Sequence, residues 1–339
     1  MLQKRECFGM KWMGFLTLLT IGSAVSAEPE LPVLVRSFET TARPAPVFQE
    51  GRFQPEAGET ITFLGGNNVF DLQRTAQLET AIYLAWPDLH LKIRNLGWQG
   101  DTVYHQARPR FFYTKTGDPQ PGSTPDIRER TTPGITFFLF GKMESLDHDA
   151  EIEKFGIAYR ALLDEFQNRV TKRIVLVAPT PFFEVGPAAS LATSRNETLS
   201  DYVNEIETIA AERKFLFVNL FEEFLEDLNP AFSSNGIHLT DSGHRKLAEI
   251  FASELNFPHK ALHPSSPFHE AINLKNRYWQ QFYHPTNWAF LFGDRQHVPA
   301  SRDHIDTQKR WFVDEVNSLP GLILKTESEI HRYAKEVEK

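Results

Sequence analysis

Four short polar segments hold the residue types that could do chemistry. In chain order they are Gly65-Gly66-Asn67-Asn68, Asn95-Leu96-Gly97-Trp98-Gln99-Gly100-Asp101-Thr102, Gly141-Lys142-Met143-Glu144-Ser145 and Asn235-Gly236-Ile237-His238-Leu239-Thr240-Asp241-Ser242-Gly243-His244. Among these residues, His238 has the side chain best suited to proton transfer near neutral pH. A single loop histidine is more often structural than catalytic, so the chemistry of His238 depends on what its neighbours supply.

The composition disfavours several other kinds of site. The only cysteine, Cys7, lies near the start of the chain, so we expect no thiolate nucleophile, disulfide or cysteine–metal site beyond the first 27 residues. The Gly65-Gly66 pair is not followed by the lysine of a phosphate-binding loop. A net charge of −8 argues against nucleic acid or an anionic membrane as a partner. Six histidines lack the spacing of metal ligands, so we expect neither a metal nor another cofactor: His259, His263, His269, His284, His297 and His304.

Alternating strands and helices must position the four segments. Apolar runs predict strands at residues 61–64, 91–95, 135–140, 174–177 and 215–218. Helical patterns predict helices over 69–86, 149–170, 196–214 and 241–255, and residues 114–134 are typical of a surface loop. This alternation indicates a three-layer α/β/α fold with a five-stranded, mainly parallel sheet. Ligands of such folds bind at the carboxyl ends of the strands, where the polar segments lie.

The two ends of the chain differ from this central part. Basic residues, the apolar run Trp12–Gly22 and the small residues 24–27 predict a signal peptide over 1–27, cleaved after Ala27, and hence a periplasmic or secreted protein. The apolar run is too short to span a membrane, so we expect no membrane span after cleavage. Residues 28–57 are predicted to form an extended lead-in, and 58–257 the α/β domain. Residues 258–339 are predicted to form a helical C-terminal extension with helices at 266–282, 307–316 and 326–337.

Across residues 58–257, the four segments resemble, in the same order, the four conserved blocks of the SGNH, or GDSL-type, hydrolases. The wording N-x-G-x-x-G-D-T at Asn95–Thr102 and G-I-H-x-T-x-x-G-H at Gly236–His244 is the most specific part of the match. The resemblance implies the flavodoxin-like SGNH fold and acyl-ester hydrolysis. The extension, with Lys275-Asn276-Arg277, Pro285-x-Asn287 and Phe290-Leu291-Phe292-Gly293, resembles an uncharacterised subgroup of exported bacterial SGNH domains.

The family's catalytic positions carry over to this chain only in part. In the family a serine attacks the ester, a histidine takes its proton, an aspartate orients that histidine, and a glycine N–H and an asparagine side chain bind the oxyanion. The base falls on His238 and the oxyanion glycine on Gly100, as the pattern requires. The nucleophile falls on Asn67, the oxyanion asparagine on Met143 and the aspartate on Asn235. The resemblance also implies five residues that line the site: Gly66, Asn68, Trp98, Asp101 and Glu144.

Each departure has a chemical consequence. The amide nitrogen of Asn67 is no nucleophile, and no serine or threonine lies between Leu64 and Arg74 to replace it. The Met143 side chain has no N–H for an oxyanion. Asn235 can accept a hydrogen bond from His238, but it adds no charge to stabilise an imidazolium. We therefore expect serine-type hydrolysis to be impaired.

Two classes of function remain open. One is an exported esterase or deacetylase acting on a small-molecule or polysaccharide ester, with a carbohydrate ester as one candidate. An active enzyme would need a non-standard nucleophile, for which Ser145 and Thr102 are the nearest candidates, or a water activated by His238. The alternative is a non-catalytic module that binds a glycan or a protein, and a purely structural role is left open as a third alternative. Nothing in the sequence indicates the oligomeric state.

Overall fold

The computed structural model describes residues 48, 51–106, 131–147, 151–171, 173–187, 189–258, 266–286, 288–291, 295, 297–298, 303 and 305–336. The chain divides into two units, Met1–Leu31 and Pro32–Lys339, and every described residue belongs to the second. The predicted signal peptide, most of the predicted lead-in and residues 114–130 of the predicted loop lie outside the described residues. No helix in the described part of the chain is long and apolar enough to cross a membrane.

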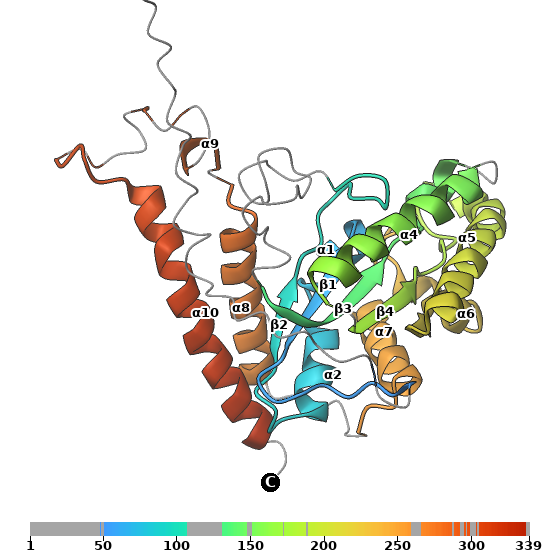
Figure 1. The fold of residues 1–339 in the computed structure, drawn as a ribbon, viewed down its shortest axis with the longest axis horizontal. Helices are drawn as coiled ribbons and strands as arrows, with labels where there is room; N and C mark the ends of the chain where they lie inside the picture. The colour runs from blue at the N-terminus through green and yellow to red at the C-terminus, as the bar shows by residue number, and fades with distance from the viewer. Residues whose placement is uncertain are drawn as a thin grey trace, which may run out of the picture. The chain divides into compact units, whose positions relative to one another are not determined.

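A single parallel sheet forms the centre of the second unit (Figure 1). Its strands are β1 Thr60–Gly65, β2 Lys92–Asn95, β3 Pro133–Leu139, β4 Arg173–Ala178 and β5 Leu216–Asn219, in the order β2-β1-β3-β4-β5. All four neighbouring pairs are parallel, which confirms the predicted fold class. The chain leaves β1 toward β2 on one side and later returns to β3 on the other. This reversal places a crevice at the carboxyl ends of β1 and β3, where ligands bind in such sheets.

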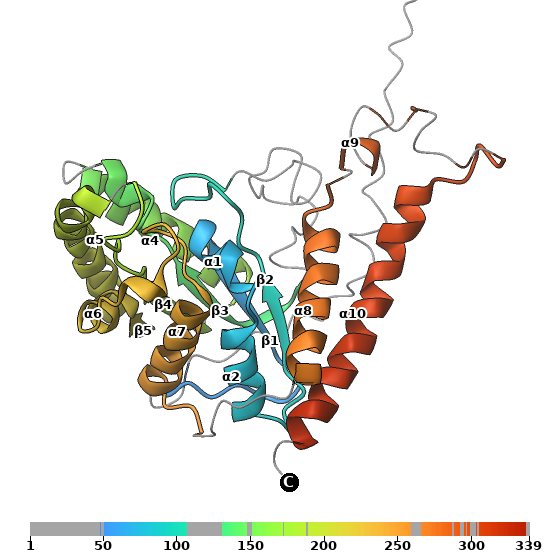
Figure 2. The same ribbon diagram turned by 180° about the vertical axis from the view of Figure 1, so that it is seen from behind.

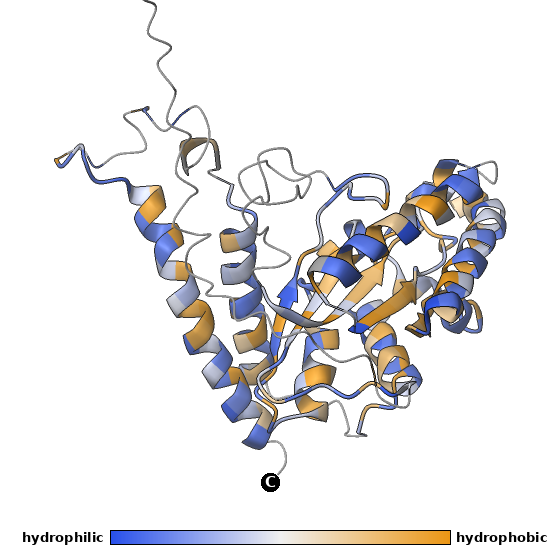
Figure 3. Cartoon of the chain, viewed as in Figure 1, coloured by the Kyte–Doolittle hydropathy of each residue, from blue (hydrophilic) through white to orange (hydrophobic). Residues whose placement is uncertain are grey.

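Helices cover both faces of the sheet (Figure 2). One core contains apolar side chains of α4 Ile152–Arg169 and α5 Ala192–Arg213, and the other contains those of α2 Gln77–Ala85 and α7 Asp241–Glu254. Strands β3 and β4 are mainly apolar because both faces of the sheet are covered, whereas β2 carries the buried polar residues Arg94 and Asn95 (Figure 3). The helices carry polar residues on their outer faces. The shorter helices are α1 Asn67–Leu72, α6 Leu220–Leu225, α9 Trp288–Leu291, η3 Glu144–Asp147, η5 Ala189–Leu191 and η6 Pro230–Phe232.

The predicted helix over 69–86 is wrong, because the structure has two helices there. Helix α1 ends at Leu72 and α2 begins at Gln77. Between them Ala76 has a φ of 56°, in the left-handed region. A non-glycine residue in that conformation cannot continue a right-handed helix, so the chain changes direction there. The break leaves α1 as a short helix that follows β1 directly in the chain.

The C-terminal extension consists mainly of α8 Ser266–Tyr283 and α10 Trp311–Glu336, which pack on each other and on α2 (Figures 1 and 2). The prediction of two helices at 307–316 and 326–337 is wrong, since α10 is continuous through Pro320. A proline removes one helical hydrogen bond. The buried side chains of Val316, Leu319, Ile323 and Ile330 hold both halves against the rest of the molecule, which favours the continuous helix.

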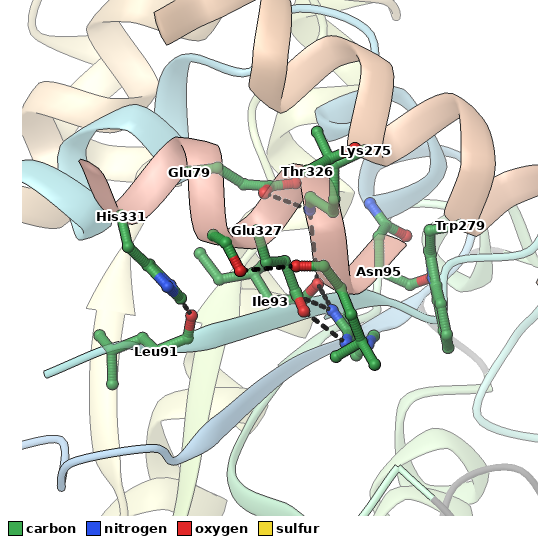
Figure 4. A network of polar contacts seen from close by, with 12 residues as sticks. Glu79, Leu91, Ile93, Asn95, Lys275, Trp279, Thr326, Glu327 and His331 are labelled. Atoms are coloured by element: carbon green, nitrogen blue, oxygen red, sulfur yellow. Dashed lines mark hydrogen bonds and ion pairs between the residues drawn. The ribbon is translucent and has the colours of Figure 1, made fainter. Parts of the chain in front are cut away.

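Buried charges join the extension to the sheet and to α2 (Figure 4). Arg94 on β2 pairs with Glu327 on α10, with Nη1 and Oε1 2.5 Å apart, and both side chains are buried. Lys275 on α8 pairs with Glu79 on α2, with 2.5 Å between Nζ and Oε2. Removing one partner of an ion pair buried to this degree is costly, because the other charge then stays buried with neither a counter-charge nor water around it. These contacts make the extension part of the folded unit.

Candidate active site

The nucleophile position lies at the point where β1 passes into α1. A Cβ atom on Gly65 would lie 2.4 Å from the carbonyl oxygen of Leu139 on β3, so only glycine allows this approach of β1 and β3. A Cβ on Gly66 would similarly lie 2.7 Å from the carbonyl oxygen of Asp101. Asn67 follows as the first residue of α1. The two glycines therefore bring Asn67 against the loop that follows β2.

Asn67 contacts the predicted oxyanion glycine directly. Its Oδ1 accepts a hydrogen bond from the backbone N–H of Gly100, with a nitrogen–oxygen distance of 3.2 Å. Gly100 has a φ of +84°, a conformation that favours glycine. The side-chain carbonyl of Asn67 thus occupies the donor that an ester oxyanion would need. The structure therefore brings Asn67 and Gly100, two of the predicted site residues, into direct contact by this hydrogen bond.

A small pocket opens beside Asn67, with a cavity volume of about 60 Å³. Met143, with 42% of its surface exposed, lines this pocket and offers it a thioether in place of an amide. Gly66, Asn68, Asp101 and Glu144 also line it, whereas Trp98, Gly100, Asn235 and His238 do not. The other lining residues are mostly apolar: Leu139, Phe140, Gly141, Lys142, Leu146, Phe182, Arg195 and Ile237.

Glu144 ties the third segment to Val103, the residue directly after the second segment. Its Oε1 accepts the N–H of Val103 at 2.8 Å, and its Oε2 accepts the N–H of Gly141 at 2.9 Å. Burial raises the pKa of this carboxyl, while the backbone N–H groups oppose that rise. Both oxygens are engaged, so Glu144 acts on the shape of the pocket.

The ring of His238 is held by a residue that the sequence analysis did not consider. Its Nδ1 lies in hydrogen-bonding contact with Oδ2 of Asp71, a buried carboxylate in α1. Asp71 comes four residues after Asn67, so the two lie on the same side of the helix. A carboxylate at Nδ1 favours the tautomer with its proton on that nitrogen and leaves Nε2 as the acceptor. Asp71 therefore takes the orienting role that the family gives to another position.

Asn235 does not orient the ring, which corrects the expectation drawn from its place in the motif. Its Oδ1 accepts the backbone N–H groups of Ile237 at 3.1 Å and of His238 at 2.9 Å. An asparagine that bonds the backbone two residues on forms a turn of its own and has no acceptor left to aim at a distant ring. Asn235 shapes the loop that carries His238.

Neither alternative hydroxyl is free for attack. Ser145 is buried, and its Oγ donates to the carbonyl oxygen of Lys142 at 2.9 Å. The Oγ1 of Thr102 accepts the N–H of His105 at 3.3 Å. Neither residue lines the pocket. The hydroxyl groups nearest to the site in sequence are therefore used by the loops themselves.

The comparisons with known proteins agree with the fold and the four segments. The family model for the GDSL-like lipase/acylhydrolase family matches residues 38–246, more than half of the chain. This chain belongs to the GDSL-like lipase/acylhydrolase family. No curated protein matches it.

Several solved structures are similar to this family member. An acetylxylan esterase from Geobacillus stearothermophilus is 22% identical, with 60% of this chain and 96% of that chain covered and a TM-score of 0.45. A catalytic mutant of that esterase is 21% identical, with 60% and 97% covered and a TM-score of 0.46. A putative GDSL-like lipase from Parabacteroides merdae is 22% identical, with 61% and 99% covered and a TM-score of 0.47.

In this GDSL-like protein the C-terminal extension supports the loop that carries Gly100. The indole Nε1 of Trp279 donates to the carbonyl oxygen of Asn95 at 2.6 Å, and the hydroxyl of Tyr283 donates to that of Leu96 at 3.0 Å. Trp98, from the same loop, packs against His284 with 3.8 Å between ring centroids and the two rings tilted by 37°. Trp98 was expected to line the site, and it instead lies buried against the extension.

The described residues offer no metal site. In the ranges given above, no group of three or more histidine, cysteine, aspartate or glutamate side chains could hold a metal ion. His259, His263 and His304 lie outside the described residues.

Proposed function

We propose that this family member has lost serine-type ester hydrolysis and retains a cleft that binds an ester or acyl ligand. The observation that carries the proposal is the hydrogen bond between Asn67 Oδ1 and the N–H of Gly100. One asparagine removes the nucleophile and also occupies a donor that hydrolysis requires. Met143 removes a second oxyanion donor.

The size of the expected loss follows from related chemistry. Removing the serine of a comparable triad costs about 10⁶ in kcat. Removing one oxyanion donor costs roughly 10²–10³, or about 2.7–4 kcal/mol. These losses are not additive, because the groups of one site act as a unit. The loss of the serine alone is enough to reduce kcat below what an ordinary assay detects.

The pocket supports ligand binding rather than a purely structural role. It remains open beside Asn67, and most of its lining is apolar, as in many small-molecule sites. A small-molecule or polysaccharide ester is the ligand class that the family resemblance suggests, and a carbohydrate ester is one member of it.

We further propose that the protein is exported to the periplasm or secreted after cleavage of the chain after Ala27.

Restoring the missing groups tests the proposal. Asn67→Ser supplies the nucleophile, and adding Met143→Asn supplies an oxyanion donor. We expect labelling by a covalent serine probe and slow hydrolysis of p-nitrophenyl acetate in the single variant, and faster hydrolysis in the double variant. Asn68→Ser, which places a hydroxyl one residue further along, is the matched control and should stay inactive. A double variant that folds and neither reacts with the probe nor hydrolyses the ester would contradict the proposal.

A second function rests on the pairing of His238 with Asp71. A histidine oriented in this way can remove a proton from water, and the water can attack an ester without a covalent enzyme intermediate. In that case the unmodified protein hydrolyses the acetyl ester without probe labelling. The activity is then lost in both His238→Ala and Asp71→Asn.

A further inference from the structure

Two cations lie against one aromatic ring at the pocket beside Asn67. The Nζ of Lys142 is 4.8 Å from the centroid of Phe182, and the Cζ of Arg195 is 5.5 Å from it. The three residues come from the loop after β3, the loop after β4 and the first turn of α5. All three line the pocket. Two separate parts of the chain therefore bring a cation each to one aromatic ring, in a protein whose net charge is −8.

Lys142 is buried without a carboxylate partner. It is 6% exposed, and its Nζ donates to Oγ1 of Thr180 at 3.1 Å and to the carbonyl oxygen of Pro181 at 2.9 Å. An ammonium group has three N–H donors, so these two acceptors leave one donor unmatched. No described residue forms an ion pair with Lys142. A lysine buried to this extent is rare unless it is paired with an opposite charge.

Arg195 is also without an ion pair among the described residues. The two carboxylates that line the pocket, Asp101 and Glu144, form no ion pair with Lys142 or Arg195. Both oxygens of Glu144 accept backbone N–H groups. Within the described part of the chain, both cations at this pocket therefore lack an ion-pair partner, which an anionic ligand could supply.

A third donor belongs to Asn68. Its Nδ2 is buried and has no hydrogen-bond partner, and the residue lines the same pocket. A buried donor without an acceptor costs about 1–3 kcal/mol. A ligand that supplies acceptor oxygens would recover that cost, and a negatively charged acceptor would also meet the two cations.

We propose that this pocket binds an organic monocarboxylate, with its oxygens toward Asn68, Lys142 and Arg195 and its short apolar chain against Phe140, Leu146 and Ile237. An inorganic anion would match the charges but leave the apolar lining without contact. The inference rests on the proposed function, because it concerns the same cleft, and it narrows the ester or acyl ligand proposed there to a free carboxylate. It does not depend on the loss of hydrolysis, which is measured separately.

The protonation of Lys142 then couples binding to pH. Burial lowers its pKa from 10.5 to about 7, so the amine carries its charge below neutral pH and loses it above. A carboxylate binds the charged form better. We expect the affinity to be highest below pH 7 and to fall by up to about tenfold per pH unit above it, since one proton is linked to binding.

Calorimetric titration of the full chain with butyrate at pH 6 tests the inference. We expect saturable binding of butyrate, weaker binding of inorganic phosphate, and no measurable binding of butyramide, which has the same shape without the charge. Arg195→Gln should raise the Kd about tenfold, and Arg245→Gln, which removes an exposed arginine of α7, should leave it unchanged. Lys142→Met should weaken binding and abolish its dependence on pH between 6 and 8.

Three results would overturn the inference: no binding of butyrate, equal binding of butyramide, or tighter binding of phosphate than of butyrate. Arg195 is partly exposed, so its variant is expected to fold and the test stands even if Lys142→Met does not. Ester hydrolysis by the unmodified protein would contradict the proposed function without affecting any of these titrations.

Discussion

The side-chain carbonyl of Asn67 accepts the N–H of Gly100 at 3.2 Å, and this hydrogen bond closes the oxyanion site from within. An ester carbonyl would have to displace that bond before it could use the same donor. The pairing arises because Gly65 and Gly66 allow β1 to approach β3 and the loop after β2. The local fold of the family is thus retained, while Asn67 and Gly100 form a hydrogen bond with each other.

We predict that Asp71 determines the tautomer of His238. In the unmodified protein the ring should carry its proton on Nδ1, and Asp71→Asn should shift the population toward the other tautomer. Nitrogen chemical shifts of the ring, measured by NMR, report the two forms. Asn235→Ala should leave the ring tautomer unchanged, because Asn235 bonds only the backbone of the loop. A tautomer shift in Asn235→Ala together with no shift in Asp71→Asn would mean that Asn235, and not Asp71, orients the ring.

Removing one charge of the buried pair between Arg94 and Glu327 should destabilise the protein strongly. Glu327→Gln leaves the Arg94 guanidinium buried without a counter-charge, and we expect a loss of about 3–5 kcal/mol in the free energy of unfolding. Glu336→Gln is the matched control on the same helix. Its partner Arg332 is 54% exposed and Glu336 52%, so solvent screens the pair and the change in stability should be much smaller than that of Glu327→Gln. Urea unfolding measures both variants, and equal effects would show that the buried pair does not anchor the extension.

Lys142 should make the stability of the protein depend on pH above neutrality. Its pKa is about 7 in the folded state and 10.5 when exposed. Between those values the unfolded chain binds a proton that the folded protein does not, so this group's contribution to stability rises with pH, by up to about 1.4 kcal/mol per unit. Below pH 7 both states carry the proton and the full cost of burying the charge applies.

The measurement is urea unfolding at pH 7 and pH 9 for the unmodified protein and for Lys142→Met. The free energy of unfolding of Lys142→Met minus that of the unmodified protein should be larger at pH 7 than at pH 9. Lys154→Met, at a lysine whose side chain is 67% exposed, controls for other titrating groups. An unchanged difference between the two pH values would mean that Lys142 titrates normally in the folded state.

Tyr283 should stabilise the loop that carries Gly100. Tyr283→Phe removes only the hydrogen bond from its hydroxyl to the carbonyl oxygen of Leu96, which costs about 1 kcal/mol. We expect faster amide hydrogen exchange over residues 96–101, with the exchange of α4 unchanged. Tyr333→Phe on α10 is the control and should leave that loop as it is. Exchange that rises equally throughout the protein would indicate general destabilisation instead of a local support.

The sequence predicted the sheet because its strands are short, apolar and separated by helical patterns. It also placed Asn67 and Gly100 at neighbouring strand ends. It could not identify Asp71, because the partner of that carboxylate lies 167 residues further along the chain. It likewise treated Lys275 as one residue of a helical appendage, although this side chain is fully buried against Glu79. Contacts between residues far apart in sequence decide both cases, and hydrophobic spacing does not record them.

The most direct test of the central claim is the initial rate of p-nitrophenyl acetate hydrolysis by the unmodified protein, compared with His238→Ala and with buffer. We predict that both proteins give the same rate, close to that of buffer, because the nucleophile is absent and Asn67 occupies the donor of Gly100. A rate well above buffer that disappears in His238→Ala would contradict this account. It would show that another group or an activated water attacks the ester.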